Sequence, residues 1–419
     1  MKAVVADLSP ARYLVTAGSQ KLPLSLGNNA GWGPGGVLRY ETDFPEPKLP
    51  TADGWVRLRT ELAGICGSDV NVAHAKSSFV LSAFYTAREQ ILGHEIVAVV
   101  DEVGPGVSRV SSGDRVALAG VLACEQRGFQ PCRSCRDGLT ELCERFDEPG
   151  VSGCHSPTQG FDAALGGGWS EQVVAHESQL FKVRDIPSAR AVLAEPASIA
   201  LHSALQWTRR GDRVVVIGPG AIGLLVIATL RKLHTDLDII VVARGEYGAS
   251  KALAAGASRT IAGGRAGLEA LVASDGGRVL RPQMTKLPIL SQGVDAVFDT
   301  VASPDTIDLG MHLLRPSGML VLIGGAGKQD VDWSLVWNRQ LTVQGTINFG
   351  PERALGGRHT MDQVTEWLAD DDYLIDGILT HTYPIEQWKT ALAEASSPTR
   401  SGRLKVALRP NADLPLVTQ

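Results

Sequence analysis

A glycine-rich turn between an apolar run and a helical pattern constrains this 419-residue chain more than any other segment. The sequence VVVIGPGAIG places Gly218, Gly220 and Gly223 in G-x-G-x-x-G register directly after the run VVVI. In that context Gly218 makes the tight turn, Gly220 lets a pyrophosphate approach the backbone, and Gly223 lets the helix pack closely on the strand. The N-terminus of the helix, which begins with Ala221 and Ile222, attracts the anion. The segment therefore predicts a dinucleotide-binding site formed by these five residues.

The pattern on either side of this turn predicts the fold class. From about residue 205 the apolar runs DRVVVIG, DIIVVAR, GVDAVFDTVAS and MLVLIGG alternate with the helical patterns AIGLLVIATLRKL, KALAAGA and TIDLGMHLLRPSG. Strands that alternate with helices indicate a doubly wound parallel sheet. The first third instead alternates β-like runs such as EIVAVVDEVG with Gly and Pro turns, which predicts a twisted, barrel-like β domain. We expect an α/β chain whose tail segment GRLKVALRP rejoins the first domain.

The expected boundaries divide the chain into three segments. Residues 1–204 form the β domain, residues 205–349 form the dinucleotide-binding domain, and residues 350–419 return to the first domain. The length is too great for one ordinary domain, so two domains are the natural expectation. Two further segments are interpreted as surface insertions, the glycine-rich residues 10–38 and the long, mildly basic loop 274–292.

The end of the second strand of the parallel sheet indicates which dinucleotide binds. NAD calls for an acidic residue there, which holds the ribose 2′-hydroxyl. In this chain the strand ends VVARGE, with Ala243 at that position and Arg244 immediately after it. A small residue followed by arginine suits a 2′-phosphate, so NADP is favoured over NAD. NAD stays open as the alternative, because Glu246 lies within reach of the ribose.

Composition and charge exclude several functional classes. The net charge is −5 and the pI about 6.0, which offers no electrostatic footprint for nucleic acid. No apolar run reaches the roughly 18 residues that a membrane span needs, and the first residues lack the order of a signal peptide. We therefore expect a cytoplasmic protein that acts on a small molecule and binds neither nucleic acid nor a membrane.

The cysteines are concentrated in one short segment. The sequence LACEQRGFQPCRSCRDGLTELCER, residues 122–145, holds four of the six cysteines of the chain. Structural disulfides are rare in the reducing cytosol, and six cysteines in 419 residues lie far below the density of a disulfide scaffold. Metal binding is therefore favoured over disulfides and over redox catalysis.

A second group of potential metal ligands lies upstream. The segment GICGSDVNVAH carries Cys66, and ILGHEIVAVV carries His94 and Glu95. Thiolate, imidazole and carboxylate are ligand types that zinc takes in catalytic sites, with one position left for water or substrate. Adjacent side chains point apart on a regular strand, so either a local turn reorients one of them or Glu95 stays behind the ligands. These residues predict a catalytic zinc site.

In combination, these motifs resemble the zinc-dependent medium-chain dehydrogenase/reductase family, the alcohol dehydrogenase superfamily. The segments GICGSD, GHE, GDRVAL, the cysteine cluster, EPASIALH and GPGAIG occur in family order over nearly the whole chain. The resemblance implies a GroES-like catalytic domain around an inserted Rossmann domain. It is closest to the polyol and threonine dehydrogenase branch, where the EPxS motif supplies a glutamate near the metal, here Glu195. Cys66 and His94 would then be zinc ligands, and Glu95 or Glu195 would complete the set.

The resemblance also implies roles around the substrate hydroxyl. Ser68 would contact that hydroxyl and begin a proton relay, and Asp69 would orient a zinc ligand. The family often has a histidine at the position that Asn71 occupies in this chain. That departure puts the usual relay in doubt. His74 is a possible substitute, although a solvated side chain is the more common fate of such a histidine.

For residues 122–145 the resemblance implies a structural zinc lobe. The family spacing is C-x₂-C-x₂-C-x₇-C, and the last three cysteines of the segment keep its last two intervals. Phe129 occupies the first ligand position, but Cys124 lies upstream, and a seven-residue gap can loop back to a tetrahedral site. Cys154 is a second candidate for the fourth ligand, and an incomplete lobe is a further alternative. The expected ligands are Cys124, Cys132, Cys135 and Cys143.

The expected activity is hydride transfer between a nicotinamide cofactor and a secondary or polyol-type alcohol, or the corresponding ketone or aldehyde. Zinc would act as a Lewis acid that lowers the pKa of the alcohol. The alternatives are a zinc-free NADPH-dependent alkene or quinone reductase on the same fold, and a catalytically silent scaffold. Retention of the ligand set and of the three glycines argues against both. The segments MLVLIGG and LTVQGTINFG resemble edge strands through which family members dimerise, so a homodimer or homotetramer is expected.

Overall fold

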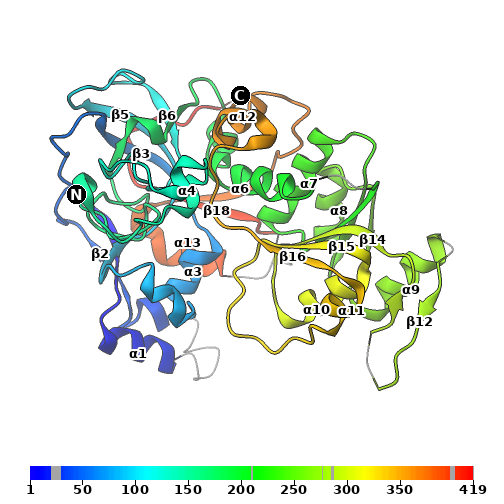
Figure 1. Ribbon diagram of the computed structural model, residues 1–419. Coiled ribbons are helices and arrows are strands. Elements are labelled where there is room, and N and C mark those ends of the chain that lie inside the picture. Colours follow the sequence, from blue (N-terminus) through cyan, green and yellow to red (C-terminus); the bar gives the residue numbers. More distant parts are fainter. Residues whose placement is uncertain (20–29, 209–210, 276, 285–286, 397–401, 419) are drawn as a thin grey trace.

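The computed structural model describes residues 1–19, 30–208, 211–275, 277–284, 287–396 and 402–418 (Figure 1). Two large sheets lie side by side in it, one in the left-hand and one in the right-hand part of Figure 1. The chain enters the left-hand part first, crosses to the right, and returns.

The right-hand sheet has six parallel strands in the spatial order β11-β10-β9-β14-β15-β16. Numbered along the chain this order is 3-2-1-4-5-6, and it reverses between β9 and β14. Sheets of this type bind ligands beyond the carboxyl ends of the strands at such a reversal. The predicted doubly wound sheet is confirmed. Its strands are β9 (Arg213–Ile217), β10 (Asp238–Val242), β11 (Arg259–Ile261), β14 (Val294–Asp299), β15 (Leu314–Leu322) and β16 (Thr342–Gly345).

Helices cover both faces of this sheet because its strands are apolar on both sides. Alternate side chains of β9 belong to two different buried clusters, which different helices complete. In Figure 1 one group of helices lies above the strands and α10 and α11 lie below them. The helices are α6 (Ala194–Leu205), α7 (Ala221–Leu233), α8 (Glu246–Ala254), α9 (Gly264–Asp275), α10 (Pro304–Leu313) and α11 (Ser334–Arg339).

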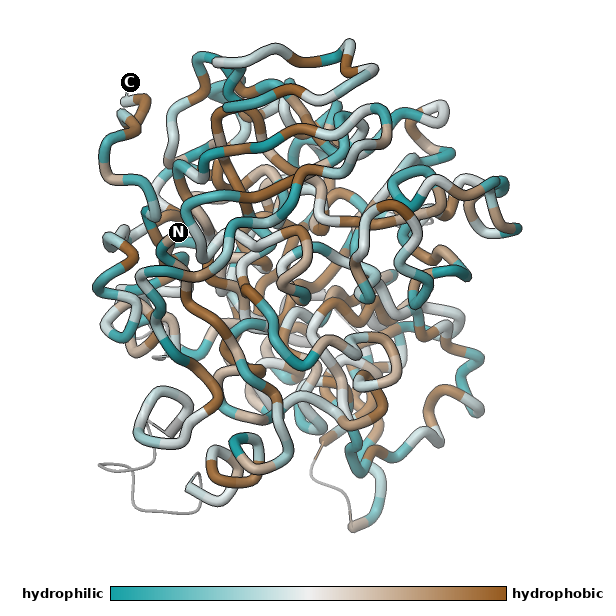
Figure 2. The backbone as a smooth tube through the Cα atoms, turned by 90° about the vertical axis from the view of Figure 1, so that its left-hand side faces the viewer, coloured by the Kyte–Doolittle hydropathy of each residue, from teal (hydrophilic) through white to brown (hydrophobic). Residues whose placement is uncertain are grey.

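The left-hand sheet has seven strands in the order β17-β18-β3-β5-β6-β8, with β7 also paired to β3. The tail segment GRLKVALRP contains β18, which pairs antiparallel with β3 and so returns the last part of the chain to the sheet of the first part. Figure 2 shows the apolar runs of the backbone concentrated in the interior. The strands are β3 (Trp55–Gly64), β5 (Glu95–Val103), β6 (Arg115–Leu118), β7 (Gln172–His176), β8 (Leu180–Lys182), β17 (Leu379–Pro384) and β18 (Lys405–Arg409).

The remaining elements are short. A three-stranded sheet in the order β2-β1-β4 consists of β1 (Ala3–Asp7), β2 (Leu38–Glu41) and β4 (Glu89–Ile91). The α-helices are α1 (Pro10–Ser19), α3 (Gly67–Ala73), α4 (Arg133–Arg136), α5 (Ser188–Ala191), α12 (Thr360–Trp367) and α13 (Trp388–Ala395). The 3-10 helices are η1 (Ala30–Trp32), η2 (Phe79–Ala83), η3 (Thr140–Leu142), η4 (Gly150–Ser152), η5 (Glu177–Gln179), η6 (Arg353–Leu355) and η7 (Ile385–Gln387).

Three details differ from the sequence-based expectations. The segment 10–38 contains the helix α1, and residues 20–29 lie outside the described part of the chain. The segment 274–292 is not wholly a loop, because β12 (Val279–Leu280) and β13 (Ile289–Leu290) pair as a hairpin within it. The run MLVLIGG is not an edge strand, since β15 lies between β14 and β16, and only LTVQG supplies the edge.

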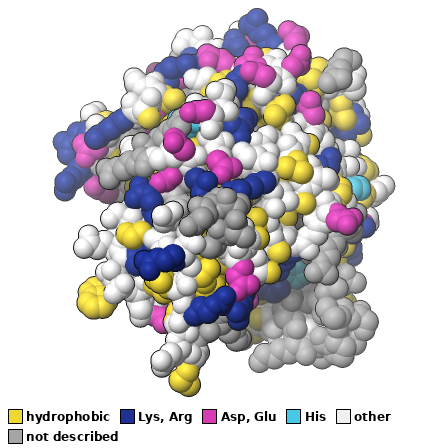
Figure 3. Space-filling view, turned by 90° about the vertical axis from the view of Figure 1, so that its right-hand side faces the viewer, with side chains coloured by type: hydrophobic (Ala, Val, Ile, Leu, Met, Phe, Trp, Pro, Cys, Tyr) yellow, Lys and Arg dark blue, Asp and Glu magenta, His cyan; other side chains and the backbone are white. Residues whose placement is uncertain are grey.

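The distribution of charge on the surface and the length and apolar character of the helices both bear on which kinds of partner the protein contacts. Figure 3 shows acidic and basic side chains interspersed over the face that carries α9 and β12. Among the described residues, none of the helices combines the length and the apolar character that crossing a bilayer requires.

One buried histidine makes the fold sensitive to acid. His359 caps α12 by accepting a hydrogen bond from the Met361 amide (3.1 Å), and its ring packs against Phe181 and Phe349. Burial lowers the pKa of His359 to about 4. Above the ordinary value near 6.5 this histidine is neutral in the folded and the unfolded chain. Below it the unfolded chain binds a proton first, so stability falls until the pH reaches about 4.

We therefore expect the free energy of unfolding to fall by up to about 3 kcal/mol between pH 7 and pH 4 on account of His359 alone. The variant His359→Asn keeps an acceptor for the Met361 amide and does not titrate. Urea unfolding of both proteins at several pH values measures the difference between them. Parallel pH profiles for the two proteins would show that His359 does not carry this effect.

Candidate metal and cofactor site

Cys66 lies at the junction between β3 and α3. It is the N-cap residue of α3, in extended conformation, and its amide donates a hydrogen bond to Asp69 Oδ2 at 2.9 Å. The short helix starts with the sequence GSD, which supplies the acidic residue in the first turn. This local capping fixes where the Cys66 thiol points.

His94 precedes β5, which begins at Glu95. Gly93 has a φ of +89°, and a Cβ atom there would lie 2.4 Å from the Trp169 side chain, so glycine is required at the turn. The turn separates His94 from the regular alternation of the strand. The sequence predicted either such a turn or a Glu95 side chain held apart, and the turn is present.

The structure brings Cys66, His94 and Glu95 together. One potential ligand atom from each lies within 4.8 Å of the others, and His94 and Glu95 are buried. Two atoms of this group, His94 Nδ1 and Glu95 Oε2, are buried without a hydrogen-bond partner among the described residues. A thiol, an imidazole and a carboxylate that converge in this way fit a zinc ion with an open position.

Asp69 lies behind His94. Its side chain is fully buried, and Oδ1 lies 3.6 Å from His94 Nδ1 and accepts a hydrogen bond from the Gly93 amide at 3.3 Å. Burial alone would lower the pKa of His94, but Asp69 and Cys66 outweigh that effect and hold it well above its ordinary value. Excess negative charge therefore surrounds the imidazole, which a bound cation would complement.

Lys405, which the sequence analysis did not single out, completes the surroundings of Glu95. Its Nζ donates to Glu95 Oε1 at 2.5 Å and to the Ile65 carbonyl at 3.3 Å, and both side chains are buried. The other oxygen, Oε2, occupies the place where a Cβ on Gly64 would lie, at 1.9 Å. The one available signal in the sequence was the lysine that precedes the apolar residues VAL in the strand KVALR.

Glu195, the other predicted ligand, is not part of this group of three. It lies in the first turn of α6, and burial raises its pKa to about 7. Electrostatic interactions with His94 and Glu95 also act on its carboxyl group, the first lowering and the second raising the pKa. The structure thus places Glu195 beside the group, with Glu95 as the nearer carboxylate.

Two predicted relay residues differ in their surroundings. Ser68 Oγ is buried and has no hydrogen-bond partner among the described residues, so it is available to a ligand hydroxyl. The expectation that His74 is solvated is wrong, because its side chain is buried. His74 Nε2 lies 3.2 Å from Ser396 Oγ, and the ring meets Trp32 edge-on at 5.5 Å. The insertion that contains Trp32 therefore covers this histidine.

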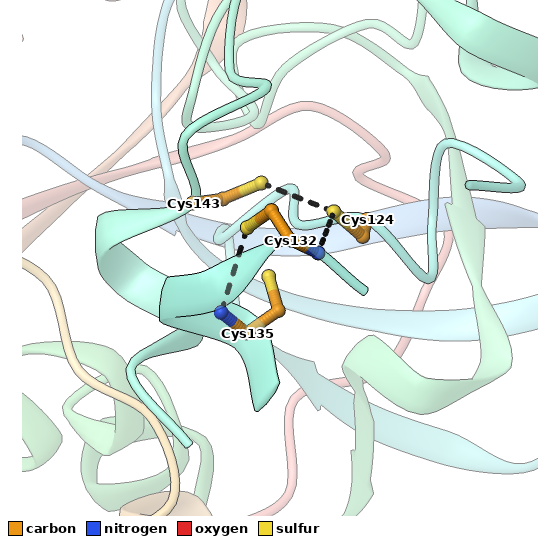
Figure 4. A group of neighbouring side chains, drawn as sticks. All are labelled: Cys124, Cys132, Cys135 and Cys143. Atoms are coloured by element: carbon orange, nitrogen blue, oxygen red, sulfur yellow. Dashed lines mark hydrogen bonds between the residues drawn. The ribbon is translucent and has the colours of Figure 1, made fainter. Parts of the chain in front are cut away.

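Four cysteines converge in a second group (Figure 4). Their sulfur atoms lie within 4.8 Å of one another, and Sγ of Cys124 and Cys143 are 3.7 Å apart. Tetrahedral zinc with bonds of about 2.3 Å separates its sulfur ligands by roughly 3.8 Å. Cys154 is buried but lies outside this group, with its thiol against the Ser156 carbonyl. The cysteines that meet are Cys124, Cys132, Cys135 and Cys143.

Local contacts explain how the upstream cysteine reaches the group. The Cys132 amide donates to Cys124 Sγ at 3.3 Å, and the Cys135 amide donates to Cys132 Sγ at 3.5 Å (Figure 4). Phe129, which lies within the seven-residue gap, packs under the Arg145 guanidinium at 3.6 Å. The gap therefore folds as a compact turn with its own packing, and the residues present fit a structural zinc ion.

The glycine turn has the geometry that its sequence predicts. Gly218 has a φ of +95°, and a Cβ on Gly223 would lie 1.9 Å from the Gly218 carbonyl oxygen. Gly220 is the N-cap of α7, whose first residues are Ala221 and Ile222, and a Cβ at Gly220 would meet no atom. The space beside Gly220 is open, as a pyrophosphate requires.

The predicted ribose-contacting residues lie beyond the end of β10. The Ala243 amide donates to the Ile261 carbonyl at 3.0 Å, which keeps Ala243 at the carboxyl end of β10. Arg244 and Glu246 are both exposed, and Glu246 is the first residue of α8. Arg244 is thus available to a phosphate next to the glycine turn.

Two protein-family models match consecutive parts of the chain. The model described as alcohol dehydrogenase GroES-like domain matches residues 52–185. The model described as zinc-binding dehydrogenase matches residues 221–370. Together they cover the group of Cys66, His94 and Glu95 and most strands of both large sheets, whereas β9, β17, β18, Gly218 and Gly220 lie outside the matched ranges.

Known proteins with similar sequences and structures span most of the chain. It is 28% identical to a probable D-xylulose reductase A of Aspergillus clavatus, over 75% of this chain and 80% of the relative. It is 26% identical to an L-threonine 3-dehydrogenase of Anaeromyxobacter sp., over 83% of this chain and 89% of that relative. The crystal structure of short chain alcohol dehydrogenase (rspB) from E. coli CFT073, complexed with cofactor NADH, superposes with a TM-score of 0.68 at 22% identity. That match covers 89% of this chain and 95% of the other.

Proposed function

Because this chain belongs to the zinc-dependent medium-chain dehydrogenase/reductase family, in its polyol and threonine dehydrogenase-like branch, we propose that it transfers a hydride between a nicotinamide cofactor and a secondary or polyol-type alcohol. The reverse reaction reduces the corresponding ketone or aldehyde. One observation carries this proposal: Cys66, His94 and Glu95 converge beside the unpartnered Ser68 hydroxyl.

We assign the zinc ligands to Cys66 and His94, with Glu95 or Glu195 as the third. Bound there, zinc supplies Lewis-acid chemistry that lowers the pKa of the alcohol. Asp69 Oδ1 lies 3.6 Å from His94 Nδ1, too far for a hydrogen bond, and its charge would help to orient the His94 ring as a ligand. Either carboxylate could serve as the third zinc ligand, since Glu95 lies within the group of potential ligands and Glu195 lies beside that group.

The residues around the ligands position the substrate and pass on its proton. Ser68 Oγ is buried and has no partner among the described residues, so it is free to accept a hydrogen bond from the alcohol; as it takes the alcohol proton, its own hydroxyl proton would pass to solvent water. Lys405 holds Glu95 at one oxygen and leaves Oε2 unpaired. The lysine thereby compensates the negative charge of a buried carboxylate that would otherwise be costly.

The cofactor lies, in this proposal, across the turn formed by Gly218, Gly220 and Gly223. NADP is favoured over NAD, because Ala243 leaves room where an acid would repel a 2′-phosphate and Arg244 is exposed beside it. The four-cysteine group takes a second, structural zinc.

Three further properties are part of the proposal. We infer the domain division 1–204, 205–349 and 350–419, supported by the return of β18 to β3. We infer a homodimer or homotetramer, supported by the position of β16 at the edge of the six-stranded sheet among the described strands and by the exposed Trp337 of α11. A cytoplasmic location is inferred because the six cysteines are free thiols, four of them placed as metal ligands.

The test is to measure zinc per chain in unchelated protein and to assay secondary alcohols with NADP and NAD in parallel. We expect two zinc ions per chain, from the two groups of ligands, and faster turnover with NADP. Protein with no zinc that still reduces activated alkenes would instead support the zinc-free reductase. Protein that binds zinc and cofactor but turns over no alcohol would support a scaffold.

A further inference from the structure

A series of aromatic rings leads away from the candidate metal ligands. The Phe161 ring stacks on the His94 ring, with centroids 5.2 Å apart and planes inclined by 27°. The Tyr85 ring packs in turn on Phe161, and the centroids of these two rings are 5.0 Å apart. The site therefore has an aromatic wall that begins at a metal ligand.

Contacts of the neighbouring residue hold Phe161 in place. The Asp162 carboxylate accepts hydrogen bonds from the amides of His155 and Ala164, each at 2.8 Å. A β-bridge also joins Asp162 to Ile91. A ring fixed in this way presents a preformed surface, which lowers the entropic cost of binding a ligand against it.

The rings continue into an exposed apolar surface. The Tyr85 amide donates to the Leu81 carbonyl at 3.1 Å, so Tyr85 lies one turn from η2. On η2 itself Phe79 is 77% exposed and Val80 is 74% exposed. Contiguous apolar surface on a folded protein marks a binding site more often than chance. The η2 surface, as we call it, consists of Phe79, Val80, Leu81, Phe84, Leu14 and Val15.

The N-terminal insertion extends this surface. The Tyr13 ring of α1 lies 5.6 Å from the Phe79 ring, and its hydroxyl donates to the Ala75 carbonyl at 3.0 Å. Figure 1 shows α1 directly below the region of α3. The insertion thus brings Tyr13 against η2, and the next two residues of α1, Leu14 and Val15, are also exposed apolar side chains.

The faces of these rings carry no polar atom, and the polar pair that includes Thr158, beside Tyr85, is already hydrogen-bonded. Asn348 Nδ2 donates to Thr158 Oγ1 at 3.2 Å, a contact that joins the two halves of the molecule. An arm with several hydroxyl groups would lie against Phe161 and Tyr85 with few partners left for it. Burying a hydroxyl without a partner costs binding energy, whereas burying methylene groups there contributes to it.

We propose that the substrate is an alcohol, or its ketone, with an apolar or aromatic arm of several carbons. The arm lies on Phe161 and Tyr85 and reaches the η2 surface. This inference rests on the proposed function, because the reacting hydroxyl must lie at Ser68 and the metal ligands. It separates this chain from relatives named for xylulose and threonine.

The test compares alcohols that differ only in their arm. We expect kcat/KM to rise by about threefold per added methylene from 2-butanol to 2-octanol, and 1-phenylethanol to exceed xylitol by at least about a hundredfold. The double variant F79S/V80S should reduce the gain per methylene to less than about twofold. The matched control Val103→Ser changes another exposed side chain, at the far end of β5 from Glu95, and should leave the gain unchanged.

The possible outcomes separate this inference from the proposed function. If alcohols are turned over but kcat/KM does not rise along the series, or is higher for xylitol, the proposal of an apolar arm is wrong. The proposed dehydrogenase activity would still hold in that case. A change in oligomeric mass on F79S/V80S without a change in the gain shows a contact between subunits and also overturns it. Calorimetry of 2-octanol and xylitol with protein loaded with NADPH, which cannot accept a hydride from an alcohol, measures the contribution of the arm to binding without turnover, and tighter binding of xylitol overturns the proposal.

Discussion

Replacing His94 with alanine should lower kcat/KM by at least about a thousandfold and reduce the zinc content from two ions per chain to one. The substitution removes the imidazole from the group of Cys66, His94 and Glu95 and leaves only two of the three potential ligands, too few to hold a zinc ion. It also removes the ring on which Phe161 stacks. The measurements are steady-state kinetics with NADP and elemental analysis of the purified variant.

The control for this variant is His155→Ala. His155 is exposed and lies in the segment before Phe161, so its substitution tests for a general effect of losing a histidine near the site. We expect it to retain two zinc ions and activity within about threefold of the parent protein. A His94→Ala protein that kept both its zinc ions and its activity would exclude this group as the catalytic centre.

The second large effect concerns stability. We expect Cys124→Ser to lose the structural zinc and to lower the free energy of unfolding by at least about 3 kcal/mol. In a protein of 419 residues the thermal midpoint should fall by at least roughly 3–4 °C. The reason is that three sulfur ligands cannot close a structural site, and Cys124 contacts both Cys143 and the Cys132 amide. Calorimetry and zinc analysis measure the two effects together.

Cys154→Ser provides the matched control, because Cys154 is equally buried but lies outside the four-cysteine group. It should keep both zinc ions and lose less than about 2 kcal/mol. The reverse result, with zinc lost from Cys154→Ser and kept in Cys124→Ser, would make Cys154 the fourth ligand. Retention of two zinc ions by both variants would show that the lobe does not need four cysteines.

Much of the fold could be predicted from the sequence because its determinants are local. The glycine turn needs only a strand before it and a helix after it, and both are encoded within about twenty residues. The run MLVLIGG shows the limit of such reasoning. A short apolar strand looks the same at the edge and in the middle of a parallel sheet, and only the pairing of β16 with β15 settles its place.

The site was less predictable where distant parts of the chain meet. Cys66 and His94 lie in recognisable motifs, whereas Lys405 reaches Glu95 only because β18 pairs with β3. No local pattern announces that contact. The burial of His74 likewise depends on Trp32, which belongs to a segment that precedes the motif by about forty residues. Long-range packing therefore decides the environment of residues whose identity the sequence makes plain.

The Lys405–Glu95 contact has a consequence for the order of events during synthesis. The two residues are 310 positions apart, so almost the whole chain must leave the ribosome before the lysine can neutralise the carboxylate. Until then Glu95 has no cationic partner from β18, and a nascent chain would present its ligands without their counter-charge. The four-cysteine lobe lies within residues 124–143 and can close long before that point. The two metal centres of one polypeptide are therefore expected to mature at different times, the structural one first.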